Sequence, residues 1–273
     1  MKHLFTILFI GILFFSCSSN EDDATDTNSD PLVKQIKFDG ATNTGLAINS
    51  QEINFNFEYD NSKRLTKKVG GYLAISSNTG FDRIFSNKVY TSFVYSNNKV
   101  TVENFYDSDV YAVAKGTIYY TLNSANLIVE KEVPNSIAIN SKKLVYKYSD
   151  GKLTEVVTSY PNMTYYPDDE TDFILTFSEK FYYDAKNNLT KTEYTELHNG
   201  KSDGRKIVRT FEEYDTSYNP FKRMQLVEEY FYRSLSKNNF RKYTETSYYH
   251  DDVSTKETGW KFVYDTQGNI IVN

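Results

Sequence analysis

The densest acidic group in the chain outside its N-terminal segment consists of Asp168, Asp169, Glu170 and Asp172. Carboxylate oxygens are the ligands that calcium prefers in proteins. The four residues do not follow the alternating Asp order with a central Gly that defines a calcium loop. They are a candidate site for a divalent cation, and a solvated acidic loop is the alternative.

Histidine offers a second candidate for metal binding. Neither His198 nor His250 has another His at metal-ligand spacing, but each has acidic neighbours, namely Glu196, Asp251 and Asp252. Such groups could hold an ion only with ligands from elsewhere in the chain. The sequence contains no Gly-x-Ser-x-Gly, no phosphate-binding loop and no paired-glycine fingerprint. We therefore expect no cofactor and no catalytic activity.

Aromatic residues are abundant, with 24 Tyr, 19 Phe and one Trp. Exposed tyrosines on a sheet can stack on sugar rings or anchor a protein partner. Tyr165 and Tyr166, beside the acidic group, are the candidate ligand-binding pair. The other interpretation is that tyrosines cover a two-sided sheet with their hydroxyls in water, and we expect Trp260 to belong to the core.

The chain begins with Lys2 and a run of apolar residues from Leu4 to Phe15, which Ser16 and Cys17 follow. Such a run makes roughly 18 Å of helix at about 1.5 Å per residue, too short for the ~30 Å hydrocarbon core of a bilayer. The segment 1–16 is typical of a signal peptide. Its end resembles the lipobox of bacterial lipoproteins, with Phe14 in place of the usual Leu.

That resemblance implies that Cys17, the only Cys in the chain, carries a diacylglycerol thioether and an acylated amino terminus. Two or more acyl chains hold a domain at a bilayer firmly. Residues 17–31 are polar and acidic, so we expect a flexible tether. The acidic residues directly after Cys17 are also similar to an export signal that places lipoproteins on the cell surface. The implied location is the outer membrane, on its outer or periplasmic face.

Charge argues against nucleic acid as a partner. The chain has 31 Lys and Arg against 36 Asp and Glu, and removal of residues 1–16 takes away Lys2 alone, which changes the net charge from −5 to −6. Basic residues alternate with acidic ones instead of clustering, whereas phosphate binding needs a basic surface. A lone Cys also excludes a disulfide framework, so the fold must depend on its apolar and aromatic core.

A phrase returns along the chain: two aromatic residues two positions apart, as in Phe57 and Tyr59, a small polar turn, then an aliphatic residue. Side chains alternate along a strand, so the aromatic residues share one face. Asp60, Asp184 and Asp265 can form Asx turns, and Asn or Gly late in the loop tolerates positive φ. Each copy therefore predicts a β-hairpin. The seven copies are residues 57–67, 93–101, 120–128, 146–154, 182–191, 214–221 and 263–271.

The segments between the copies are rich in Tyr, Phe, Thr and Val and show no helical period. We predict an all-β fold for residues 32–273, a single domain in which an antiparallel meander of 12 to 16 strands forms one long twisted sheet. Open twisted sheets rarely exceed about ten strands, so this sheet must curl, split or partly close. Little helix is expected.

The phrase of Tyr-Asp, loop, Asn or Gly, and Leu-Thr-Lys resembles the YD repeat of Rhs-type proteins. With the lipobox and the acidic tether, the chain is similar to lipoproteins of Gram-negative bacteria that carry related domains. The repeated Gly-Arg phrase of Rhs shells is absent. The resemblance implies a β-sheet surface and gives no catalytic residue.

Three functions remain open at this point. The first is a lipid-anchored, non-catalytic module that binds a glycan, a peptide or a partner protein. The second is a structural or assembly subunit of an envelope complex, which predicts an exposed sheet edge or apolar patch. The third is a hydrolase, which requires convergent carboxylates in a cleft.

Overall fold

The computed structural model describes residues 32–38, 53–77, 80–106, 116–266 and 269–272, with the backbone alone for 74–84. The predicted signal peptide, the Cys17 lipidation site and the tether lie outside these residues. Residues Pro31–Asn273 form one compact unit. Among the described residues, no helix has the length and apolar character needed to cross a membrane.

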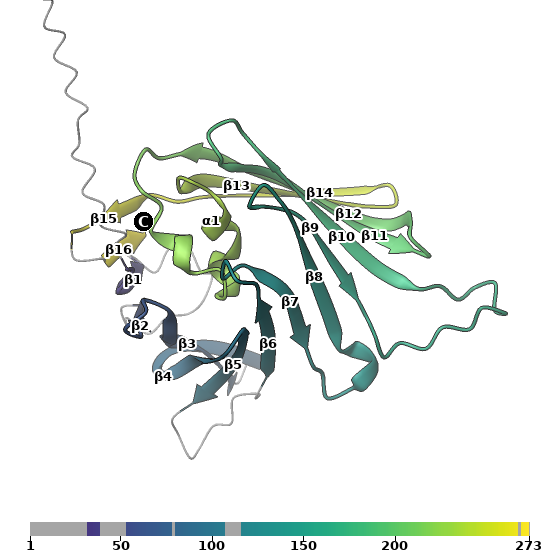
Figure 1. The fold of residues 1–273 in the computed structure, drawn as a ribbon, viewed down its shortest axis with the longest axis horizontal. Helices are drawn as coiled ribbons and strands as arrows, with labels where there is room; N and C mark the ends of the chain where they lie inside the picture. The colour runs from purple at the N-terminus through teal and green to yellow at the C-terminus, as the bar shows by residue number, and fades with distance from the viewer. Residues whose placement is uncertain (1–31, 39–52, 78–79, 107–115, 267–268, 273) are drawn as a thin grey trace, which may run out of the picture. The chain divides into compact units, whose positions relative to one another are not determined.

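Within the described residues, sixteen strands form one sheet. Figure 1 shows how this sheet curls. Their order is β14-β13-β12-β11-β10-β9-β8-β7-β6-β5-β4-β3-β2-β1-β16-β15, so strands β1 to β14 follow one another as a meander. The strands are β1 (Gln35–Phe38), β2 (Ile53–Tyr59), β3 (Leu65–Ser77), β4 (Gly80–Ser96), β5 (Lys99–Tyr106), β6 (Thr117–Leu122), β7 (Ile128–Val133), β8 (Lys142–Ser149), β9 (Lys152–Ser159), β10 (Leu175–Tyr183), β11 (Leu189–His198), β12 (Lys201–Tyr214), β13 (Phe240–Tyr249), β14 (Asp252–Gly259), β15 (Phe262–Tyr264) and β16 (Asn269–Val272).

This architecture confirms the predicted all-β fold, with one exception in strand direction. The pair β1 and β16 is parallel, with Ile36 opposite Ile270, because the C-terminal strand inserts beside the first strand of the meander. The remaining pairs are antiparallel, as expected for hairpins. The edge strands β14 and β15 are joined by Trp260 and Lys261 but do not pair, so the sheet curls without closing.

The predicted turns have the predicted chemistry. In the turn between β10 and β11, Asp184 Oδ1 accepts hydrogen bonds from the amides of Lys186 and Asn188 at 2.8 Å each. Asn187 has a φ of 68°, in the left-handed region that Asn tolerates. The amide of Asp184 donates to the carbonyl of Asn188, and Tyr183 then faces Leu189. Asp60 forms the equivalent Asx bonds in the turn between β2 and β3.

The copy at 214–221 does not form a tight hairpin, and here the prediction was wrong. Tyr214 pairs with Phe240, and the amide of Asp215 donates to the carbonyl of Asn239. The same bond, from the Asp amide to an Asn carbonyl, closes this turn and the tight turn at Asp184. Here, however, a long segment lies between the two residues. We call residues 215–239 the insert.

The insert contains the helical elements η2 (Pro220–Arg223), η3 (Glu228–Tyr230) and α1 (Phe231–Leu235), and η1 (Ala138–Asn140) precedes β8. These elements agree with the expectation of little helix. The insert lies against the curled face of the sheet, as Figure 1 shows. Its buried apolar residues are Phe221, Met224, Leu226 and Val227. Pro220 fits the first turn of η2, where no amide is needed, and Asn219 Oδ1 accepts from the amide of Phe221.

The core lies between the insert and one face of the sheet. Phe57, Phe181 and Phe211 point from different strands toward rings of the insert, at centroid distances of 5.3–6.5 Å. Trp260 packs against this core beside Phe240 and Tyr243, in agreement with its predicted place. The insert therefore supplies the second layer that one curled sheet needs in order to bury an apolar face.

Candidate functional site

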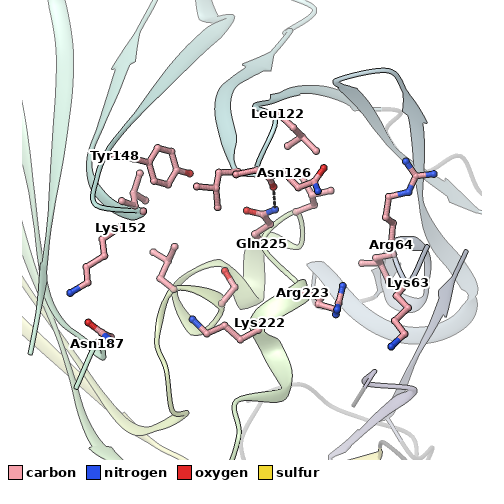
Figure 2. A pocket seen from close by; sticks show the side chains of 18 of the residues that line it. Lys63, Arg64, Leu122, Asn126, Tyr148, Lys152, Asn187, Lys222, Arg223 and Gln225 are labelled. Atoms are coloured by element: carbon pink, nitrogen blue, oxygen red, sulfur yellow. Dashed lines mark hydrogen bonds between the residues drawn. The ribbon is translucent and has the colours of Figure 1, made fainter. Parts of the chain in front are cut away.

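A cleft of about 840 Å³ lies between the insert and the turns of several hairpins. Figure 2 shows its walls, with Lys63 and Arg64 from one turn, Tyr148 and Lys152 from another, and Arg223 and Lys222 from the insert. Because successive strands of a meander turn at alternate ends of the sheet, these turns lie along the same end. The cleft is thus made by repeated elements on one side and by the single insert on the other.

The cleft is basic although the chain as a whole is acidic. Its cationic lining residues are Lys63, Arg64, Lys152, Lys222 and Arg223. None of the described lining residues is Asp or Glu. Among the described residues, Lys63, Lys152 and Lys222 take part in no ion pair. The lining therefore has an excess of positive charge that is available to an anion.

The cations of the turns are positioned by neighbouring aromatic rings. Arg64 Nη2 forms an ion pair with Asp60 at 2.7 Å, and the guanidinium lies 4.4 Å from the ring centroid of Tyr95. Lys152 Nζ lies 5.7 Å from the ring of Tyr183 in the same manner. In each case a cation of one hairpin lies over the tyrosine ring of a later hairpin. This contact holds the cation at the cleft.

Tyrosine rings line the cleft beside these cations. Tyr148 donates its hydroxyl hydrogen to the carbonyl of Ile128 at 2.8 Å, which links one hairpin to the preceding one. Burial raises the pKa of Tyr95 and of Tyr148 to about 12. Both hydroxyls therefore stay protonated at neutral pH and offer rings and dipoles without adding negative charge.

Two residues of the insert complete the cleft. Gln225 Nε2 donates to the carbonyl of Asn126 at 2.6 Å, the bond drawn in Figure 2, and fixes the insert to the turn between β6 and β7. The Lys222 side chain reaches the cleft, but the walls displace water around it, and this desolvation lowers the pKa of Lys222. A bound anion would restore the favourable surroundings that water otherwise gives this ammonium group.

The predicted acidic site does not assemble. Asp169 Oδ1 accepts from the amide and the hydroxyl of Thr171, and the Thr171 hydrogen bonds lower the pKa of Asp169. Asp172 Oδ2 accepts from the amide of Tyr166 at 2.7 Å. These carboxylates shape their own loop between β9 and β10. In the described part of the chain, no three His, Cys, Asp or Glu side chains are grouped as metal binding would require, and this includes Asp168 and Glu170.

Tyr165 and Tyr166 lie on that same loop and are exposed, at 37% and 63%. They do not line the basic cleft. They also line none of the other cavities described for this part of the chain. Their role in binding stays a prediction.

The two histidines are placed by local contacts. His198 Nε2 lies 2.8 Å from Glu196 Oε1, and its ring stacks on Phe173 at a centroid distance of 3.6 Å. His250 occupies the turn between β13 and β14 with a φ of 51°, and its ring contacts Tyr249. Each belongs to a separate part of the sheet, so the two do not form a common site.

The cleft residues were not among the sequence-based candidates. Lys63 and Arg64 end the turn between β2 and β3, and Lys152 is the first residue of β9; Arg64 and Lys152 directly precede the buried Leu65 and Leu153. A basic residue that recurs at this position of the repeat is a sequence signal for the cleft. The reason is that alternate turns of a meander lie at the same end of the sheet. The contribution of Lys222 and Arg223 had no such signal, because the insert was interpreted as a tight turn.

Comparisons with known proteins find similar structures but no family for this chain. No family model matches the chain, and no curated protein matches its sequence. A porin-like protein from Bacteroides uniformis ATCC 8492 is 12% identical with a TM-score of 0.46 over 80% of this chain and 79% of that chain. A porin-like protein from Bacteroides vulgatus ATCC 8482 is 11% identical with a TM-score of 0.47 over 82% and 88%. We transfer no function from either structure to this chain.

Proposed function

We propose that this protein is a non-catalytic binding module of the bacterial cell envelope, held at the outer membrane by lipid on Cys17, and that its basic cleft binds an anionic glycan. The observation that carries the ligand class is a set of three lysines, Lys63, Lys152 and Lys222, which take part in no ion pair among the described residues and line a cleft whose described lining includes no carboxylate. Such a cleft focuses the positive field of its lining cations and therefore attracts anions. A basic cleft in an acidic chain is suited to selective anion binding.

Two features favour a glycan over an acidic peptide. The ring of Tyr148 lines the cleft and can stack on a sugar face while the cations bind carboxylate or sulfate groups. The walls consist of turns instead of a free strand edge, so the cleft offers no ladder to which an extended peptide would add a strand.

The carboxylates of the sheet support a hydrolase less well than the cleft supports anion binding. Glu179 and Glu245 approach each other from β10 and β13, but Arg209 lies between them at 3.1 and 2.9 Å. Burial acts to raise the pKa of Glu245, yet the Tyr243 hydrogen bond and the charge of Arg209 bring it below its ordinary value. A general acid needs a raised pKa, so this pair has the properties of a structural ion cluster.

An assembly role remains the second candidate, and one observation favours it. The outward-facing Val94 on β4, Val253 on β14 and Val263 on β15 are 52–63% exposed. The edge strands β14 and β15 are unpaired on their outer sides within the described sheet, and such edges accept partners. Cross-linking in intact envelopes that captures one fixed protein through β14 or β15 would favour this role.

The test of the proposed ligand is a binding measurement with purified protein and three polysaccharides of similar length. Polygalacturonate and dextran sulfate should bind, and unmodified dextran should not. Affinity should fall as salt rises from low to physiological ionic strength, because salt screens the cleft. Equal binding of dextran would contradict an electrostatic site, and preference for poly-glutamate would favour an acidic peptide.

Variants locate the binding. The pair Lys63→Gln and Lys152→Gln should weaken polygalacturonate binding about tenfold, since each cation contributes about 0.5–1 kcal/mol at a partly exposed site. The matched control, Lys180→Gln with Lys256→Gln, removes the same charge from residues outside the cleft lining and should change affinity less than twofold. A control as damaging as the cleft pair would show that only net charge matters.

The anchor is tested separately. Metabolic labelling with a fatty acid should mark the protein, and Cys17→Ser should remove the label and release the domain from membranes. Unlabelled protein with an intact Cys17 would contradict the envelope anchor while leaving the cleft proposal untouched.

A further inference from the structure

A second cavity lies on the other side of the insert and differs in character from the basic cleft. It has a volume of about 500 Å³, within the ~300–1,000 Å³ of typical ligand pockets. Its walls come from β1 to β5, β15, β16 and the insert. Ile36, Phe38, Phe55, Val89 and Val272 are among its apolar lining residues. We call it the apolar hollow.

A buried cation lines this hollow. Arg233 is 6% exposed, and its guanidinium lies within 4.0–4.7 Å of the ring centroids of Phe240, Trp260 and Phe262. It donates through Nη1 to Asn239 Oδ1 at 2.5 Å and to the carbonyl of Phe240 at 2.6 Å. Aromatic faces and neutral acceptors partly replace the water that this charge has lost.

The guanidinium retains unused donors. Among the described residues, Arg233 has no ion-pair partner, and neither Nε nor Nη2 has a hydrogen-bond acceptor. The only fully buried side-chain atom without a partner in the described chain is Thr192 Oγ1, so these nitrogens keep access to open space. Arg233 is among the residues that line the hollow.

The other charges of the hollow leave it net positive. Lys68, which is 7% exposed, forms an ion pair with Glu229, and both line the hollow. Lys68 Nζ also lies 5.1 Å from the ring of Phe55. One carboxylate thus accompanies two cations, and Glu229 is paired with Lys68 and not with Arg233.

Two glycines of β3 let the side chains of β4 pack closely on one wall of the hollow. A Cβ on Gly71 would lie 2.6 Å from Val89 Cγ1, and one on Gly70, whose φ is 111°, would lie 2.8 Å from Phe85 Cζ. A side chain at either position would therefore displace the rings and methyl groups that form this wall.

We propose that the apolar hollow binds a free fatty acid, with its carboxylate at Arg233 and its chain along Phe55, Val89 and Tyr72. The fork of the guanidinium matches a carboxylate, and burial makes such a pair strong when its donors are used. Tyr72, which is 36% exposed, marks the side of the hollow that is open to solvent, so the chain extends from the buried charge toward solvent. This inference is independent of the glycan proposal, because the two cavities share no described lining residue.

The single tryptophan makes the test direct. Trp260 lines the hollow and lies 4.5 Å from the Arg233 guanidinium, so a ligand head at Arg233 must change its fluorescence. Purified protein is titrated with dodecanoate, dodecanol and dodecyltrimethylammonium below their micelle concentrations. We expect saturable binding of dodecanoate at least ten times tighter than that of dodecanol, and none of the cationic analogue.

A chain-length series tests the apolar part. Affinity should rise from hexanoate to dodecanoate, and acetate should not bind. Arg233→Gln should remove the preference for dodecanoate over dodecanol while leaving dodecanol binding within threefold. If this variant does not fold, the headgroup and chain-length series on the unmodified protein still decide. Unchanged Trp260 emission with dodecanoate, or equal affinity for dodecanoate and dodecanol, overturns the proposal.

Discussion

The turn between β10 and β11 and the turn between β12 and β13 begin with the same residues and have different consequences. Tyr183-Asp184 closes after four residues on Asn188, and Tyr214-Asp215 closes on Asn239. Both use the bond from the Asp amide to the Asn carbonyl. The first turn reverses the chain and contributes Asn187 to the basic cleft, whereas the second carries the segment that forms one wall of each cavity. In this protein the candidate sites arise where one repeat is interrupted.

The comparison also shows how the expanded turn is kept in place. Asp215 is 8% exposed and accepts from the amide of Asn239 at 3.2 Å and from the hydroxyl of Tyr264 at 2.7 Å. Asn219, which is fully buried, donates to the carbonyls of Arg233 and Ser236. Asp184 of the tight turn accepts its hydrogen bonds at a half-buried position, whereas Asp215 and Asn219 of the expanded turn form theirs inside the protein, where an unpaired group is expensive.

The largest effect we expect is alkaline unfolding of sheet and insert together. Burial raises the pKa of Tyr95, Tyr148 and Tyr194 to about 12 from an unfolded value near 10. Because the folded pKa is the higher one, the stability is fully present below pH 10 and is lost as the pH rises toward 12. Tyrosinate absorbance at 295 nm and far-ultraviolet circular dichroism should change in one transition. Two separate transitions would show that the insert and the sheet unfold independently.

Removal of the main apolar anchor of the insert should distinguish the two layers. Phe221 is 1% exposed and packs against Tyr230 and Phe262, so Phe221→Ala should cost about 3–5 kcal/mol of unfolding free energy. Ile207→Ala, on β12 away from both cavities, should cost about 2–5 kcal/mol. Urea denaturation measures both. Only Phe221→Ala should also weaken polyanion binding under native conditions, and equal loss of binding in both variants would contradict the role of the insert.

The fold could be predicted from the sequence because its determinants are local. The aromatic pair, the Asx turn and the returning aliphatic residue lie within about ten positions, as in Tyr182 to Lys191, and each copy pairs with its neighbours along the chain. The parallel pair of β1 and β16 could not be predicted in this way, because Ile36 and Ile270 are far apart in the sequence.

The candidate sites were harder to predict from the sequence, because they too depend on residues that are far apart in the chain. Tyr214-Asp215 has the local signature of a tight turn, and its partners, Asn239 and Phe240, come much later. The sequence Asn239-Phe240 does match Asn188-Leu189 and Asn269-Ile270, in which an Asn precedes the buried residue of a return strand. A search for that second half of the repeat would have found the insert. The convergence of the turn lysines depends on sheet curvature, which no local pattern specifies.

The two opening aspartates provide a matched pair of substitutions with a smaller effect. Asp215→Ala leaves two buried donors unpaired and should cost about 2–5 kcal/mol. Asp184→Ala removes bonds at a half-buried turn and should cost about 1 kcal/mol. Thermal or urea denaturation of both variants measures the difference. Equal costs would mean that the expanded turn is no more dependent on its Asp than the tight one.

The smallest expected effect is on the pH dependence of binding at the cleft. Desolvation lowers the pKa of Lys222, so this lysine loses its charge earlier than an ordinary lysine as the pH rises. Affinity for polygalacturonate should therefore decline as the pH is raised from 7 to 10, where the polysaccharide charge is constant. Lys222→Gln should flatten this decline, and an unaltered slope in that variant would assign the effect to another group.

The most direct test of the account is amine footprinting of the purified protein with and without polygalacturonate, with acetylated lysines identified by mass spectrometry. The account predicts that the polysaccharide protects Lys63, Lys152 and Lys222 together, which lie on two hairpin turns and on the insert. Lys180 and Lys256 should remain equally reactive in both conditions. Protection spread evenly over all lysines, or absent from Lys222, would contradict a binding cleft built jointly by the repeated turns and the insert.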